Sequence, residues 1–444
     1  MIEMKQGKTT KLKLVTTNLL ILFLVNSTQA QVWDLQQCID TALVNNKKLK
    51  IGKNDILIGE QKNREARANL IPKVIVSAEY KYYTDLPYQL MPLSVFGGPE
   101  GQFKEAQFGV PHNINANIQL SVPLYNPQAY GAIKATQVAM DIKEIQYQKT
   151  EETIYLEVSS LYYNAQILNN QFNFIDSNIT ANRSLLKNIE LLHQQLLVQH
   201  TDVDRVALQL EKLKSQSEII KNKYEQVLNG LKFLMGISIQ RQIDVDSNIE
   251  YESSNTYATV SGLDFLMAKS HSILLKSELT TLKRTRLPSV SLFGSYGTMG
   301  YGYDTKPDEF LNFYPVGLAG LQIKYPLFNG TVTQRKIDQK ELEIMNSELQ
   351  LALIDDQSEM LIENAQMNKK AMQLTVETNL LQIDLANSIY NNTELQRRNG
   401  TSSLSDVLMA DLALREAQQN YLAAIVDYLK ADLELKNVTG NTLK

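Results

Sequence analysis

The chain contains few of the residues that enzymes and metal proteins use. One cysteine, Cys38, and four scattered histidines occur among 444 residues. A lone cysteine cannot form an intramolecular disulfide, and the histidines show no metal-ligand spacing with it. A catalytic triad, a phosphate-binding glycine loop and a zinc motif are also missing from the sequence. We therefore expect neither an enzyme nor a cofactor or metal site.

After residue 30, the sequence has no apolar run of about 20 residues, the length that a transmembrane helix needs. Membrane insertion would therefore have to use strands. The N-terminus has a short apolar run, residues 19–25, preceded by four lysines and followed by small residues that end at Ala30. This pattern predicts a signal peptide over residues 1–30 rather than an anchor. Its removal takes away four lysines and one glutamate, so the net charge of −4 becomes about −7, which disfavours nucleic acid as a partner.

Glycine and proline are missing from three long stretches, residues 132–229, 331–399 and 401–439. One unbroken helix over the first stretch would be roughly 150 Å long. We therefore expect long helix pairs that reverse direction once. Apolar positions in the first stretch have the 4-3-4-3 spacing of packed helices: Ile154, Val158, Leu161, Ala165 and Leu168.

The sequence also repeats itself at an offset of about 204 residues. IQLSVPLYNP (118–127) returns as LQIKYPLFNG (321–330), and DVDRVALQL (202–210) returns as DVLMADLAL (406–414). Each copy is predicted to contain a β-hairpin and a pair of long helices.

The predicted strands alternate apolar and polar residues over segments of about ten residues, as outer-membrane strands do around a wet lumen. A half-buried soluble sheet has the same alternation, but tyrosines gather near the loop ends of the hairpins, as in an interfacial girdle. Four strands cannot close a barrel, so a membrane location requires an oligomer. The residues predicted to face lipid are Val76, Ala78, Tyr80, Ile118, Leu120, Val122, Val290, Leu292, Leu321, Ile323 and Tyr325.

Several motifs in this order resemble the TolC-like outer-membrane efflux protein family over essentially the whole chain after residue 30. They are LQQCIDTALVNNKKLK (35–50), ANLIPKVIVSAEY (68–80), TRLPSVSLFGSY (285–296), the strand exits VPLYN and YPLFN, and the block 399–440. The resemblance implies a mostly α protein with membrane β structure. Three chains would form a 12-stranded β-barrel, with four strands per chain, continued by a long periplasmic α-helical barrel. The chain would lie in the outer membrane of a Gram-negative bacterium.

The resemblance also implies a function and partners. The homotrimer, in contact with outer-membrane lipid, would be the passive exit duct of a tripartite efflux or type I secretion system. A periplasmic adaptor and an inner-membrane pump, either proton-driven or of the ABC type, would complete that system. The alternative is a periplasmic coiled-coil scaffold or adaptor with a soluble β-subdomain, which would be extracted without detergent.

The family closes its periplasmic mouth with acidic residues at the helix tips, and Asp202 and Asp406 take these positions by motif. Both could instead be ordinary first-turn carboxylates of a helix. The sequence departs from the family pattern at Arg397, Ser402 and Met409, and the first copy has Leu196 where the second has Gly400. The gate candidates are Asp202, Asp406, Arg397, Gly400 and Ser402.

The expected organisation follows from the repeat and the resemblance. It comprises a signal peptide (1–30), a first periplasmic helix (31–72), β-hairpin 1 (73–124), the long helices of repeat 1 (125–235), an equatorial linker (236–262), the first helix of repeat 2 (263–286), β-hairpin 2 (287–327), the long helices of repeat 2 (328–436) and a C-terminal tail (437–444).

Overall fold

A computed structural model describes residues 31–107, 109–249, 257–258, 260, 262–303 and 312–442. The predicted signal peptide lies outside the described residues, as do parts of the predicted linker and tail. The chain forms two compact units. The helical unit contains residues 31–53, 147–263 and 355–442, and the sheet unit contains residues 54–146 and 264–354. Helices α3 (Lys47–Ala68), α4 (Pro127–Gln194) and α7 (Val332–Arg398) contribute to both units.

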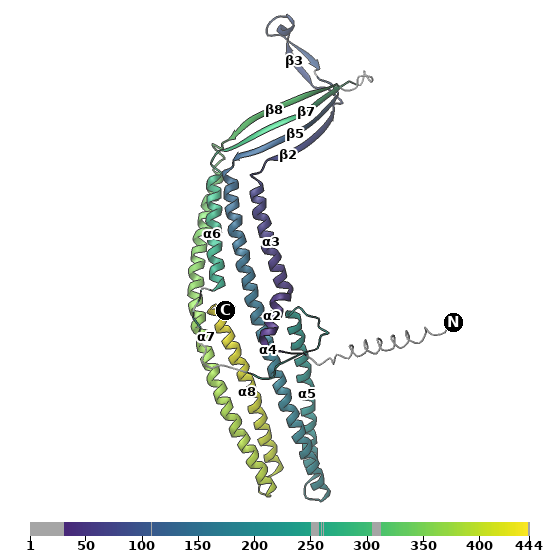
Figure 1. The fold of residues 1–444 in the computed structure, drawn as a ribbon, viewed down its shortest axis with the longest axis vertical. Coiled ribbons are helices and arrows are strands. Elements are labelled where there is room, and N and C mark those ends of the chain that lie inside the picture. The colour runs from purple at the N-terminus through teal and green to yellow at the C-terminus, as the bar shows by residue number, and fades with distance from the viewer. Residues whose placement is uncertain are drawn as a thin grey trace, which may run out of the picture. The chain divides into compact units, whose positions relative to one another are not determined.

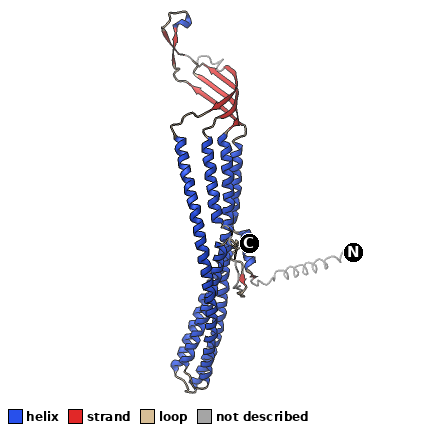
Figure 2. Cartoon of the chain, turned by 90° about the vertical axis from the view of Figure 1, so that its left-hand side faces the viewer, coloured by secondary structure: helices blue, strands red, loops and turns tan. Residues whose placement is uncertain are grey.

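The sheet unit is built around four antiparallel strands in the order β2-β5-β7-β8 (Figures 1 and 2). The strands are β2 (Lys73–Tyr82), β5 (His112–Tyr125), β7 (Ser289–Gly302) and β8 (Asn312–Lys324). The predicted hairpins therefore meet through β5 and β7 and form one sheet. Among the described strands, β2 and β8 each have a single neighbour, so each leaves one edge of the sheet unpaired.

A second, smaller hairpin lies in the loop between β2 and β5, inside the segment predicted as β-hairpin 1 (73–124). Strand β3 (Tyr88–Pro92) pairs with β4 (Phe103–Gln107), and the 3₁₀ helix η1 (Leu93–Phe96) connects them. The sheet unit also contains most of α6 (Leu263–Arg284). Ion pairs join α6 to α7: Lys276 lies 2.9 Å from Glu348, Lys283 lies 3.0 Å from Glu341, and Lys340 lies 3.0 Å from Glu278.

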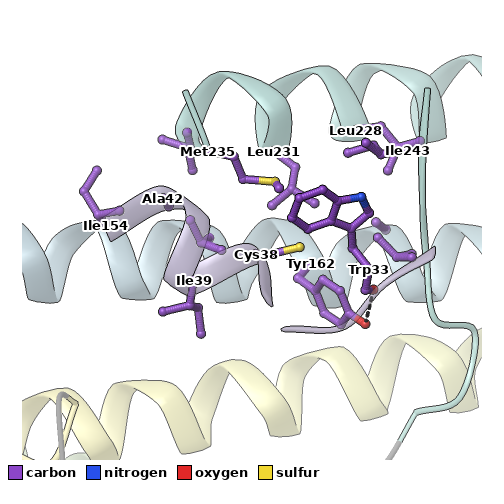
Figure 3. Close-up of a cluster of buried hydrophobic side chains, with 14 of the residues drawn as sticks. Trp33, Cys38, Ile39, Ala42, Ile154, Tyr162, Leu228, Leu231, Met235 and Ile243 are labelled. Carbon is purple, nitrogen blue, oxygen red and sulfur yellow. Dashed lines mark hydrogen bonds between the residues drawn. The ribbon is translucent and has the colours of Figure 1, made fainter. Parts of the chain in front are cut away.

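The helical unit packs α2 (Leu35–Asn45), α5 (His200–Leu234) and α8 (Leu404–Val438) with its parts of α4 and α7. Its largest buried cluster surrounds Trp33 and Cys38 (Figure 3). The Tyr162 hydroxyl donates a 3.1 Å hydrogen bond to the carbonyl oxygen of Trp33. Burial raises the pKa of the Cys38 thiol to about 12, with a smaller contribution from Asp34. This cysteine is therefore a packed apolar residue.

The segment 31–72, predicted as one helix, contains a strand and two helices. Strand β1 (Gln31–Trp33) pairs in parallel with β6 (Ile243–Val245), which lies in the predicted linker. Helices α2 and α3 are separated at Asn46, whose backbone is extended (φ −58°, ψ 131°). The Asn46 side chain donates to the Leu234 carbonyl oxygen at 2.7 Å and accepts from the backbone N–H of Lys48 at 2.8 Å. These bonds replace backbone hydrogen bonds of a continuous helix, which explains the break.

Candidate functional site

The two long helix pairs reverse direction through the same backbone motif. In the turn from α4 to α5, Leu196 N–H donates to the His193 carbonyl and Leu197 N–H donates to the Leu192 carbonyl. In the turn from α7 to α8, Gly400 N–H donates to the Arg397 carbonyl and Thr401 N–H donates to the Gln396 carbonyl. Both patterns are Schellman caps, which need one residue with positive φ. Gly400 adopts φ 76° without strain, whereas Leu196 adopts φ 59° with a side chain that is 89% exposed.

The Asp406 carboxylate is directed at the start of its own helix. One of its oxygens accepts hydrogen bonds from Ser403 N–H at 2.9 Å, Ser403 Oγ at 2.6 Å and Ser402 Oγ at 3.1 Å. Ser403 Oγ accepts from the Asp406 N–H in return, which completes a capping box. The Ser403 and Ser402 bonds lower the pKa of Asp406, so its exposed carboxylate is anionic. Asp406 thus has the helix-capping role that the sequence analysis held open, and Ser402 is one of its partners.

Asp202 lies in the first turn of α5 and interacts with two arginines. Its carboxylate is 3.9 Å from Arg205 Nη1, and it also interacts electrostatically with Arg397 at the end of α7. Partial burial lowers the pKa of Arg397, and the charge of Asp202 opposes that shift. Arg205 also donates a 3.3 Å hydrogen bond to Ser405 Oγ at the start of α8. The structure therefore joins the two helix tips through Asp202, Arg205, Arg397 and Ser405, a group that we call the tip cluster.

The sequence analysis identified Asp202 and Arg397 separately and missed Arg205 and Ser405. Arg205 follows Asp202 by three residues, the spacing of a helical ion pair, and this signal could have identified it. Met409, one of the positions at which the sequence departs from the family pattern, is exposed on α8.

A buried polar layer lies along the helical unit between the tips and the main cluster. Asp411 and Arg415, four residues apart on α8, form a 2.5 Å ion pair with both side chains largely buried. Asn182 on α4 hydrogen bonds to Asp411, and the side-chain amide of Gln209 on α5 faces the Arg415 guanidinium. Burial raises the pKa of Asp411, and Arg415 and Asn182 oppose that rise. These four residues, the polar layer, connect α4, α5 and α8, and none of them was identified in the sequence analysis.

The strand register places the predicted lipid-facing residues on a single face of the sheet. Val76 pairs with Ile118, Ile118 pairs with Tyr296, and Leu292 pairs with Leu321. Paired residues point to the same side, so the exposed apolar positions form one surface. The predicted residues inside the strands are Val76, Ala78, Tyr80, Ile118, Leu120, Val122, Val290, Leu292, Leu321 and Ile323, whereas Tyr325 follows the end of β8 at Lys324.

The opposite face is polar on β2 and β5. Ser77 Oγ donates to Asn117 Oδ1 at 2.9 Å, and the Asn117 amide donates to Asn115 Oδ1 at 3.2 Å. Farther along β2 on this face, Lys81 Nζ lies 2.9 Å from Glu79 Oε2 and forms an ion pair with it. In the described part of the chain, no helix is apolar enough over a sufficient length to cross a membrane.

Comparison with known proteins agrees with this geometry. Residues 38–237 match the family described as Outer membrane efflux protein. The chain is 19% identical to outer membrane protein TolC of Salmonella enteritidis over 430 residues, which covers 93% of this chain and 83% of that protein. The outer membrane protein VceC of Vibrio cholerae has a similar fold, with a TM-score of 0.71, 15% identity and coverage of 91% of this chain and 96% of VceC. The CmeC outer membrane channel of Campylobacter jejuni also has a similar fold, with a TM-score of 0.70, 16% identity and coverage of 92% of this chain and 86% of CmeC.

These matches support a TolC-like outer-membrane efflux protein. They place it in the outer membrane of a Gram-negative bacterium, with a periplasmic helical part. They support an outer-membrane exit duct and do not favour a periplasmic scaffold.

Proposed function

We propose that three copies of this chain form a passive exit duct that receives its cargo from a periplasmic adaptor and an inner-membrane pump. The system would perform efflux or type I secretion. The observation that carries the assembly is the four-stranded sheet, which has one apolar face and two unpaired edges, β2 and β8. In lipid, unpaired backbone groups cost several kcal/mol each, so each edge requires a neighbouring strand. Three sheets joined edge to edge give a closed barrel of twelve strands.

The helical unit independently supports lateral assembly. On α7, four apolar residues recur at seven-residue intervals, and each is more than half exposed in the single chain: Met360, Met367, Leu374 and Leu381. Seven-residue spacing is the signature of a seam between packed helices. The described part of the same chain leaves this seam uncovered, so a second copy is the partner that would bury it.

Oligomer mass and membrane location test this assembly. We expect the mature chain in outer-membrane fractions, solubilised only by detergent, as a particle of three chains that dissociates on heating. Recovery of a soluble monomer from a periplasmic extract would contradict the proposal. Cross-linking in intact cells should also attach an adaptor to the chain, and its absence from the cross-linked products would argue against the tripartite system.

We further propose that the tips form the periplasmic gate, with Asp202, Asp406, Arg397, Gly400 and Ser402 as its residues. Three copies around an axis would place rings of carboxylate at the mouth, and such rings favour cations. The tip cluster would hold the two helix pairs together in the closed state. Gly400 would permit the tight reversal, and Ser402 would fix the direction of the Asp406 carboxylate.

Replacing Asp202 and Asp406 with alanine should reduce channel block by divalent cations, because the carboxylate rings are removed. Since hydrogen bonds lower the pKa of Asp406 below its ordinary value, about 4, the share of the block that Asp406 contributes should persist at about pH 4, where an ordinary aspartate is about half protonated. Ser402→Ala provides a milder variant, which keeps both charges and loses one hydrogen bond. Unchanged divalent block in the double variant would refute the acidic gate.

A further inference from the structure

The polar face of the sheet carries a continuous apolar surface that the alternation pattern did not predict. In the register, Asn115 is followed across the sheet by Met299 and Tyr314, and Gln119 is followed by Ser295 and Leu318. Paired residues share a face, so these apolar side chains lie on the same side as the asparagines of β5. We call this surface the lumen strip, and it consists of Phe293, Met299, Tyr301, Tyr314, Val316 and Leu318.

Side-chain contacts connect the residues of the lumen strip. The Tyr301 and Tyr314 rings have centroids 6.2 Å apart, and the Tyr301 hydroxyl contacts the Met299 sulfur at 3.8 Å. The Phe293 ring covers Gly320, where an added Cβ would lie only 2.8 Å from the ring. The strip therefore presents aromatic rings and a polarisable sulfur, which adapt to varied apolar ligands.

The strip is open to solvent in the sheet unit. Tyr314 is 55% exposed, Val316 is 42% exposed and Leu318 is 53% exposed. In the proposed trimer the strip would remain open, because eight strands already give a barrel whose interior side chains just fill, and twelve strands leave a wider lumen. An apolar cover would leave asparagine amides beside the strip without hydrogen-bond partners, which disfavours lipid as the cover of this face.

We propose that the lumen strip is a transit binding surface for organic molecules that combine an aromatic or alkyl part with a polar or cationic group. The rings of Tyr301 and Tyr314 would contact the apolar part or a cation, and the β5 amides would hydrogen bond to the polar part. This inference rests on the proposed duct and assigns a substrate class to its exit. Three strips would alternate with three amide-rich walls around the lumen. A small metal ion would gain nothing from such a surface.

The test uses the full trimer in a planar bilayer and two cations of equal charge, added from the exterior side. Tetraphenylphosphonium has four aromatic rings, and tetramethylammonium has none. The lumen strip predicts that tetraphenylphosphonium interrupts the current at concentrations at least about tenfold below those needed for tetramethylammonium. Equal block by the two ions would show that charge alone is recognised and would overturn the proposal.

Variants locate the effect on the strip. Val316→Thr combined with Leu318→Thr keeps residues of high β propensity but removes apolar contact, and should weaken block by tetraphenylphosphonium about tenfold. The matched control is Ser77→Thr, which lies on β2 in the same transverse row as Val316, belongs to neither the strip nor the β5 amides, keeps its hydroxyl and should leave block unchanged. If the double variant does not insert, Leu318→Thr alone is compared with the same control, and about a threefold loss is expected.

Three results separate the inference from the proposed duct. A normal current with block that the strip variants leave unchanged would overturn the lumen strip alone. An equal loss of block in Ser77→Thr would also overturn it, because the effect would then not depend on the residues of the strip. The absence of any current from the unmodified chain would overturn the duct and the strip together.

Discussion

Arginine placed at one position of β5 should distinguish the lipid-facing side of the sheet from the lumen side. Ile118 lies near the middle of β5 (His112–Tyr125), between Val76 and Tyr296, and is 53% exposed in the single chain. Gln119 is its neighbour at almost the same depth but points to the opposite face. The two variants Ile118→Arg and Gln119→Arg therefore introduce the same charge into two different surroundings.

The expected difference is large. An arginine facing lipid at mid-depth costs roughly 2–4 kcal/mol, and a trimer carries three of them, for a total of roughly 6–12 kcal/mol per trimer. An arginine facing a wet lumen pays no such penalty and should change ion selectivity instead. We expect Ile118→Arg to show little heat-resistant trimer on detergent gels and to unfold in lipid vesicles at a lower urea concentration than the unmodified chain. Gln119→Arg should resemble the unmodified chain in both measurements.

The comparison can refute the account in two ways. Equal stability of the two variants would mean that neither face contacts lipid, as in a soluble sheet. Greater loss in Gln119→Arg would mean that the faces are reversed, and the lumen strip would then be a lipid contact.

Three further predictions concern the helical unit. Leu196→Gly should stabilise the first helix reversal by about 1 kcal/mol, and Gly400→Ala should destabilise the second by a similar amount, because only glycine adopts positive φ freely. Hydrogen exchange of the backbone amides in the adjoining turns measures both effects. Equal effects of the same sign would refute the argument. Arg415→Met should lower the free energy of unfolding, measured in urea, by roughly 3–5 kcal/mol, because Asp411 is then buried without its cation. The double variant Arg415→Met with Asp411→Leu should recover most of that loss. Cys38 should not react with maleimide at pH 8 until the chain unfolds, because the thiol is buried and its raised pKa keeps it protonated. Rapid reaction of the folded chain would contradict its placement.

Local periodicity explains why the sheet faces and long helices could be predicted. Val76 and Ile118 follow a two-residue alternation that holds wherever one face of a strand is apolar. The glycine-free and proline-free stretches similarly defined α4, α5, α7 and α8, because those two residues interrupt helices most strongly. The interruption at Asn46 was missed because it depends on the Leu234 carbonyl, which is distant in sequence.

Contacts between distant segments account for the other misses. The pairing of β1 with β6 involves three residues in each strand, too few for a periodic signal. The polar layer brings Asn182 within reach of Asp411, and neither residue stands out among the many polar positions of a long helix. The lumen strip escaped notice because Val316 and Leu318 lie between small residues on β8, where both faces are apolar.

The most direct test of the exit duct is the single-channel conductance of the detergent-purified chain in a planar bilayer, with the oligomer mass measured on the same sample. The account predicts a particle of three chains that inserts into the bilayer and forms a small, cation-selective pore that is closed most of the time. A monomer that does not insert, or a trimer that inserts without any current, would contradict it.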